Sequence, residues 1–386
     1  MKHWRHIWNR LRMRHPQTRL AVVGLLLALA LLAGCASRRV RQTSWPGLNI
    51  VDGVVYAANV EQVQAFEAEL GQLLWAYPAE PDPKAGFYAT PVLDEERNLL
   101  LTAGFNSRIV YALRLGDTPQ AQPGLVWTFD GAKGQYVGSG VIYEDLFLIG
   151  NGDGTLYAIN LDNGVLAWSF DAPEDRIWAK PVVVGDRVYV ASLDHSLYAI
   201  SGEDGAPLWE RTLNGAIAST PLVLNDSLWV GDFGNKFYQI DLETGDILWT
   251  FEGDNWFWAS PVTDGEMIFV ADVGGVVYAL DPVEKTVLWT YEIEDVVRGQ
   301  PALNADNSLL FVPGYEHGIL HALDTQEGQK MTWGTVPGNP GRLPSDLAVG
   351  EDHLYTMPIL VVERVQAFDL DSGKLAWQYP AATEEE

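Results

Sequence analysis

The chain has 386 residues, 47% of them hydrophobic and 20% charged, which excludes a disordered or low-complexity protein. Its 25 lysine and arginine residues face 51 aspartate and glutamate residues, and the net charge of -26 argues against a nucleic-acid partner, because phosphate binding needs a basic face. The single cysteine excludes a disulfide framework, a four-cysteine zinc site and a Cys-x-x-Cys redox or haem-attachment motif.

The N-terminal segment has the pattern of a secretory signal. Six basic and no acidic residues occupy positions 1–19, and an unbroken apolar run of 14 residues extends from Leu20 to Ala33. This run is shorter than the roughly 20 residues of a transmembrane helix. It leads into Leu32-Ala33-Gly34-Cys35, which resembles the bacterial lipobox, where the chain is cut before a cysteine whose thiol is lipidated.

The motif predicts a cleaved lipoprotein signal peptide at 1–34, a lipid-anchored linker at 35–45 and lipidation of Cys35. An uncleaved signal anchor is the alternative. Removal of the 34 signal residues, with their six basic side chains, leaves 352 residues with a net charge of -32. Anionic headgroups repel a surface of this charge, so the lipid must hold the protein at the membrane. The expected location is the periplasmic face of the outer membrane in a diderm cell, or the outer face of the cell membrane in a monoderm cell.

One pattern then recurs eight times along the chain. The clearest copy passes from Tyr157-Ala158-Ile159 through Gly164 to Trp168. The copies end on eight tryptophans spaced by 40 to 52 residues, and eight units near 44 residues fill the 352-residue mature chain. These are Trp75, Trp127, Trp168, Trp209, Trp249, Trp289, Trp333 and Trp377.

Within each unit the hydrophobic period is two, which indicates short strands. In the fourth unit we expect strands at 181–184, 187–191, 197–200 and 207–211, joined by turns such as Gly185-Asp186. The predicted fold is all-β: one eight-bladed β-propeller of four-stranded antiparallel blades at 46–380, followed by an acidic tail at 381–386. A β-solenoid is the rival, but its coils are shorter. The tryptophans and the small alanine after the tyrosine are interpreted as structural residues of the blades.

The repeat Ala-[Leu/Ile]-Asp-x-x-x-Gly-x-x-x-Trp resembles the PQQ-type repeat of quinoprotein dehydrogenases and their non-catalytic relatives. An eight-bladed propeller of this length behind a lipobox is most similar to the BamB family, lipoproteins of the machine that inserts β-barrels into the outer membrane. The resemblance implies a non-enzymatic, lipid-anchored binding or scaffold protein whose partner is an envelope protein, such as a barrel-assembly subunit. No partner-binding residue is carried over from that family.

The two chain ends depart from the family pattern. The chain enters near Leu48-Asn49-Ile50 and leaves after its own tryptophan strand, Leu375 to Tyr379. We therefore expect the ring to close blade against blade, without a strand shared between the two ends.

Two other functions remain open. The first is an extracytoplasmic PQQ-binding protein or quinoprotein dehydrogenase, which by resemblance would hold the quinone on a calcium ion; the chain lacks that family's adjacent cysteine pair, and no cofactor is expected. The second is a carbohydrate- or peptide-sensing propeller. No metal site is predicted, because His317 and His321 could share a strand face but His321 occupies the repeat's tyrosine position, where a packed ring is expected.

The segments that precede the first strand of each blade must cross one face of the ring and end at the channel mouth. Several carry aromatic or cationic residues that a strand-forming repeat does not need, four of them at the same distance before the next strand. A mouth of this kind would suit an anionic planar ligand or a peptide with an acidic group, whereas the alternative is ordinary packing of blade edges. The candidate binding residues are Tyr88, Trp178, Lys180, Trp258, Arg298 and Arg342.

Overall fold

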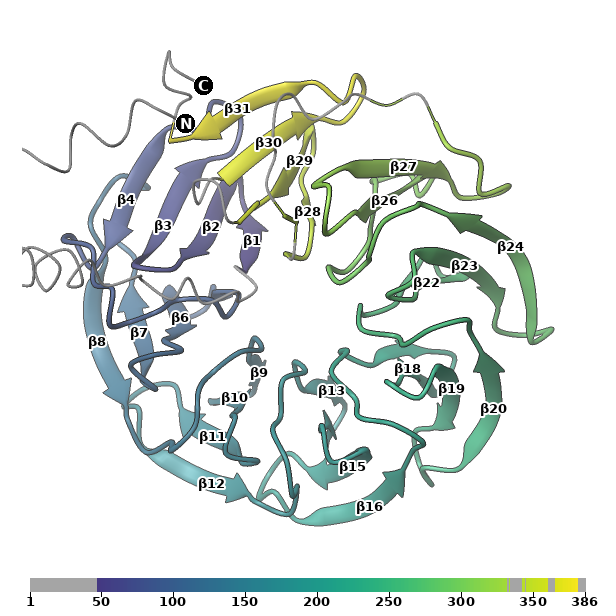
Figure 1. Cartoon of the computed structure of the whole chain (residues 1–386). Helices are drawn as coiled ribbons and strands as arrows, with labels where there is room; N and C mark the ends of the chain where they lie inside the picture. Colours follow the sequence, from purple (N-terminus) through teal and green to yellow (C-terminus); the bar gives the residue numbers. More distant parts are fainter. Residues whose placement is uncertain (1–46, 332, 334–341, 344, 360–364, 381–386) are drawn as a thin grey trace, which may run out of the picture. The chain divides into compact units, whose positions relative to one another are not determined.

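The computed structural model describes residues 47–331, 333, 342–343, 345–359 and 365–380, and the regular elements in these residues are β-strands. The strands form eight antiparallel sheets, or blades, that follow one another around a common axis (Figure 1). Seven sheets contain four strands in sequence order, and the seventh blade contains three, followed by an isolated bridge between Leu323 and Lys330. The predicted eight-bladed all-β propeller is confirmed.

The strands of each blade run in chain order from the axis to the rim. Blades 1 to 4 comprise β1 (Leu48–Val51), β2 (Val54–Asn59), β3 (Gln62–Glu67), β4 (Leu73–Tyr77), β5 (Val92–Asp94), β6 (Leu99–Ala103), β7 (Val110–Arg114), β8 (Gly124–Phe129), β9 (Val141–Tyr143), β10 (Leu146–Gly150), β11 (Leu156–Asn160), β12 (Leu166–Phe170), β13 (Val182–Val184), β14 (Arg187–Ala191), β15 (Ser196–Ser201) and β16 (Pro207–Thr212). Blades 5 to 8 comprise β17 (Leu222–Leu224), β18 (Ser227–Gly231), β19 (Lys236–Asp241), β20 (Ile247–Glu252), β21 (Val262–Thr263), β22 (Ile268–Ala271), β23 (Val276–Asp281), β24 (Thr286–Glu292), β25 (Ala302–Leu303), β26 (Leu309–Pro313), β27 (Leu320–Asp324), β28 (Ala348–Val349), β29 (His353–Thr356), β30 (Val365–Asp369) and β31 (Leu375–Tyr379).

Tight turns join the strands because their residues accept a positive φ. Gly185, between β13 and β14, has φ 61°. Asn225 and Asp226, between β17 and β18, have φ 51° and 55°. Positive φ at both central positions is the requirement of a type I′ hairpin, whose twist matches that of the flanking strands.

The core lies between neighbouring blades. Between blades 4 and 5, Tyr189 and Ala199 of one sheet face Leu228 and Val230 of the next, and all four side chains are buried. Ala199 follows the repeat's tyrosine, and its small side chain permits the close approach of the two sheets that the repeat predicts.

The repeat tryptophans link blades at the rim. Trp209 of β16 donates its indole N–H to the carbonyl oxygen of Leu242 in blade 5 (3.1 Å), and its ring lies so close to Gly245 that a Cβ there would approach it to 2.7 Å. A bulge opposite Ala199 and Ile200 shifts the register beside this tryptophan, and bulges of this kind redirect a side chain. Two of the eight tryptophans are buried and six are half-buried; the buried pair are Trp75 and Trp127.

The ring closes through side-chain packing between the first and last blades, which share no strand. Trp377 donates its indole N–H to the carbonyl oxygen of Ala68 (2.8 Å), and the Tyr355 hydroxyl donates to the same oxygen (3.1 Å). Phe66 and Val365 are buried in the same cluster. The predicted blade-to-blade closure is therefore present.

Candidate functional site

The segments that cross from the rim to the axis are held as extended chains between two blades. Before β21, the Phe257 N–H donates to the carbonyl oxygen of Asp232 in blade 5 (3.0 Å), while the Val273 N–H of blade 6 donates to the carbonyl oxygen of Trp256 (2.8 Å). In an extended chain successive side chains alternate. Phe257 is therefore buried, and its neighbours Trp256 and Trp258 face outward.

Buried aspartates fix these crossing segments. Asp272, at the turn between β22 and β23, is fully buried and accepts hydrogen bonds from the Asn255 N–H (3.1 Å), the Val276 N–H (3.1 Å) and the Tyr278 hydroxyl (3.0 Å). Asp232 does the same in blade 5 for Gly215 and Tyr238. Each carboxylate thus ties a crossing segment to a hairpin of the following blade.

Replacing Asp272 with alanine is expected to lower the free energy of unfolding by about 2–3 kcal/mol, because it leaves buried donors without an acceptor. Hydrogen exchange at the Asn255 amide should accelerate at the same time, since the crossing segment loses its anchor. The matched control is Asp254→Ala on the same segment, whose side chain is exposed. Equal losses in the two variants by urea unfolding would show that Asp272 does not hold the segment.

Side chains at one position of the crossing segments form an outer ring around the mouth. The position lies three residues before the residue that directly precedes the inner strand, which is a proline in five blades. The small Ala218 of blade 5 leaves space between Trp178 of blade 4 and Trp258 of blade 6, whose ring centroids are 6.4 Å apart. The described members of the outer ring are Tyr88, Val137, Trp178, Ala218, Trp258 and Arg298.

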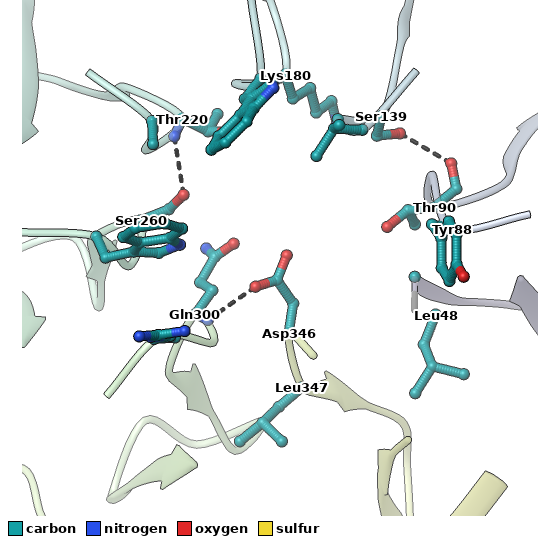
Figure 2. A pocket seen from close by; sticks show the side chains of 17 residues that line it. Leu48, Tyr88, Thr90, Ser139, Lys180, Thr220, Ser260, Gln300, Asp346 and Leu347 are labelled. Carbon is teal, nitrogen blue, oxygen red and sulfur yellow. Dashed lines mark hydrogen bonds between the residues drawn. The ribbon is translucent and has the colours of Figure 1, made fainter. Parts of the chain in front are cut away.

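Two residues further along each segment, polar side chains form a second ring that we call the polar ring. Backbone N–H groups of one blade donate to side chains of the next, from Thr220 to Ser260 (2.9 Å) and from Gln300 to Asp346 (2.8 Å), and the Ser139 hydroxyl donates to the Thr90 carbonyl oxygen (2.9 Å; Figure 2). The described members are Thr90, Ser139, Lys180, Thr220, Ser260, Gln300 and Asp346.

The two rings enclose a cavity of about 390 Å³, which Leu48 and Leu347 also line. This volume lies within the range of ligand sites. Figure 2 shows the polar-ring side chains arranged around the cavity, with the Asp346 carboxylate directed into it. The crossing segments therefore build a concave site on one face of the propeller.

Aromatic rings and guanidinium groups continue outward from the cavity as a band. The Arg298 guanidinium lies over the rings of Trp258 (5.3 Å) and Tyr315 (4.4 Å), and the Arg342 guanidinium lies over the Tyr315 ring (5.2 Å). Trp258 also stacks on Phe233 at 4.9 Å. Cation–π contacts of this kind orient both partners. We define the mouth band as Arg176, Trp178, Phe233, Trp256, Trp258, Arg298, Tyr315 and Arg342.

Two titratable groups that line the cavity, Lys180 and Asp346, have shifted pKa values. Lys180 and Asp346 are exposed to the channel, yet the surrounding blades displace much of the water around them. Desolvation lowers the pKa of the Lys180 ammonium and raises the pKa of the Asp346 carboxyl, where the hydrogen bond from Gln300 acts in the opposite direction. Both charged forms therefore gain from a ligand of opposite charge.

The structure brings five of the six candidate binding residues to this cavity. Tyr88 lines it but is buried and packs edge-to-face on Phe105 at 5.5 Å, so it offers little surface. Arg342 lies outside the cavity lining, in the mouth band, where it pairs with Glu316 (2.8 Å). Cys35 lies outside the described residues.

Sequence reasoning missed Asp346 and Tyr315. Asp346 occupies the polar-ring position of blade 8, but Leu347 stands where most other blades have a proline, so no proline marks this position in the sequence. Tyr315 belongs to the turn between β26 and β27, and only the folded chain brings it under Arg298 and Arg342.

The two histidines of blade 7 make separate contacts. His321 of β27 is buried, and burial, followed by the charge of Lys330, lowers its pKa to about 4. His317 pairs through Nδ1 with Asp295 (3.2 Å). Across the described residues no group of three or more His, Cys, Asp or Glu side chains is placed to hold a metal ion. In the same part of the chain, no helix has the length and apolarity that a bilayer crossing requires.

Solved structures share this architecture. The crystal structure of BamB from Moraxella catarrhalis is 18% identical, covers 81% of this chain and 92% of its own, and superposes with a TM-score of 0.67. The computationally designed Ika8 protein (12% identical, 81% and 93% coverage, TM-score 0.68) and the WD40 β-propeller domain of Doa1 (16% identical, 68% and 86% coverage, TM-score 0.52) are also similar. At these identities the likeness shows the fold alone.

Among curated proteins the sequence has no significant match. The family described as "Outer membrane protein assembly factor BamB" matches residues 38–177, 152–256 and 255–386. These three segments cover every blade of the propeller. The chain therefore belongs to the BamB family of PQQ-like repeat propellers.

Proposed function

We propose that this protein is a non-enzymatic scaffold of the cell envelope that holds a protein partner on its mouth face and is anchored by lipid on Cys35. The finer proposal, that the partner is a subunit of the machinery for outer-membrane protein assembly, is supported by the family's description. In a diderm cell this places the propeller at the periplasmic face of the outer membrane.

The mouth band is the observation that carries the proposal. Tryptophan, tyrosine and arginine are the residue types that dominate the energetics of protein interfaces. Here they gather on one face, and Trp256 is 51% exposed while stacked on Phe233. A large aromatic side chain exposed in a preorganised stack costs little conformational entropy on binding.

The cavity does not fit the quinone of the dehydrogenase relatives. By resemblance those enzymes hold the quinone on a calcium ion, which takes six to eight oxygen ligands, several of them from carboxylates. Of the described residues that line this cavity, Asp346 alone carries a carboxylate. We therefore derive no step through a quinone.

The proposal is tested by capture of a purified barrel-assembly subunit on the full chain in detergent. Arg298→Ala and Trp258→Ala should each weaken the binding at least tenfold, because a buried interface anchor contributes about 2 kcal/mol or more. The melting temperature should fall only slightly, since both residues are half-buried at the mouth. Added salt should reproduce part of the arginine effect by screening.

Lys374→Ala is the matched control, because Lys374 is exposed in the turn between β30 and β31, on the face opposite the crossing segments. It should leave binding unchanged. Equal weakening by Lys374→Ala and Arg298→Ala would show that the partner uses another surface, and no capture of any assembly subunit would overturn the finer proposal.

A further inference from the structure

Two opposite charges stand on facing walls of the cavity. Lys180 comes from the polar ring of blade 4 and Asp346 from that of blade 8, so in a ring of eight blades three blades lie between them on either side (Figure 2). They are therefore not partners of each other. The Asp346 carboxylate accepts one hydrogen bond from the Gln300 N–H, and its other oxygen is available to the cavity. In the described part of the chain, the Lys180 ammonium has neither an ion pair nor a hydrogen bond.

No lysine of the described residues makes an ion pair, so what sets Lys180 apart is its place inside the cavity, where the surrounding blades displace much of the water around its ammonium. Acidic residues outnumber basic ones by two to one, and Arg97, Arg187, Arg211 and Arg342 are each paired with a carboxylate. Arg298, beside the cavity, instead stacks on two aromatic rings, and its Nε is buried without a hydrogen-bond partner in the described structure. A partly desolvated cation without a counter-charge is unfavourable, and an anionic ligand reduces that cost.

The size of the cavity limits what can enter it. About 390 Å³ holds a few side chains of an extended segment and excludes a folded domain. Trp178 and Trp258 form one wall beside Lys180, and such rings pack well against the methylene stem of a long acidic side chain. One wall of the cavity therefore carries a positive charge and the facing wall a negative charge. A ligand with only negative charges would be repelled by Asp346.

We infer that the cavity receives an extended segment of the protein partner in which one acidic side chain is bound by Lys180 and a lysine or arginine is bound by Asp346. This inference rests on the proposed function and adds to it the chemistry of the bound segment. The mouth band contacts the surface of the partner around the inserted segment, while the polar ring selects the segment by its two charges.

The test uses the full chain in detergent and capped eight-residue peptides of glycine and serine that carry one glutamate and one lysine at varied separations. Calorimetric titration is expected to find a separation that binds, and exchange of its glutamate for glutamine should weaken binding about tenfold or more, as loss of a charge-assisted hydrogen bond does. Lys180→Met should weaken binding of the glutamate peptide by the same factor and leave the affinity for the glutamine peptide unchanged. Asp346→Asn should likewise weaken only peptides that retain lysine.

Lys374→Met is the control and should bind every peptide as the unchanged protein does. Equal binding of the glutamate and glutamine peptides, or equal loss in Lys180→Met and Lys374→Met, would overturn the inference. So would binding that appears only after removal of residues 381–386, because the chain's own acidic tail would then be the occupant. If Trp258→Ala still weakens capture of the assembly subunit while Lys180→Met does not, the inference fails and the proposed function stands.

Discussion

Replacing Trp127 with alanine is expected to lower the free energy of unfolding by about 3–5 kcal/mol, as removal of a large buried side chain does. The Trp127 indole is buried between blades 2 and 3 and donates its N–H to the carbonyl oxygen of Leu161 (2.7 Å). Its ring also packs against Gly164, where a Cβ would approach it to 2.7 Å. The substitution therefore opens a cavity and leaves a buried carbonyl without its donor. Chemical denaturation measures the loss.

Trp178→Ala is the comparison for this variant, because Trp178 is half-buried at the channel mouth. It should cost clearly less, since much of its ring surface faces the cavity and not a neighbouring sheet. Equal losses at Trp127 and Trp178 would show that the mouth aromatics hold the blades together and are not available to a partner.

Replacing Cys35 with alanine is expected to abolish lipid attachment, because the chain has no second thiol. Incorporation of radiolabelled palmitate should fall from stoichiometric to none. The product should be a larger precursor or a propeller released from membranes, since a net charge of -26 for the whole chain gives its surface no attraction for anionic lipid.

Ser37→Ala is the matched control, because it alters the linker and keeps the thiol. It should be labelled and fractionate with membranes like the unchanged protein. Label retained by Cys35→Ala, or absent from the unchanged protein, would show that lipid on this cysteine is not the anchor.

The strands and turns of the blades could be predicted because the sequence patterns that specify them extend over only a few residues. Alternation of apolar residues, turns such as Gly185-Asp186 and the recurring tryptophan each act over a few residues, and in blade 4 the predicted strand at 187–191 matches β14 (Arg187–Ala191) residue for residue. In blade 7, whose copy has an extra residue before Trp333, the described residues form three strands and an isolated bridge between Leu323 and Lys330.

The candidate site was predictable in part. The shared position of Trp178, Trp258 and Arg298 follows from the repeat, because equivalent residues of a propeller meet around one axis. The roles of Tyr88 and Arg342 did not follow, since burial against Phe105 and pairing with Glu316 depend on residues that the repeat does not specify.

By itself the sequence determined the eight units, the strands within them and the face that would carry aromatic and cationic residues, because all of these are repeated along the chain. The tertiary structure alone decided which charges face each other and which are satisfied. Lys180 and Asp346 are 166 positions apart, and their opposition depends on a ring of eight blades closed between Ala68 and Trp377. Coulombic and hydrogen-bond energies depend on distance in space and on local hydration, and neither is set until the ring has closed.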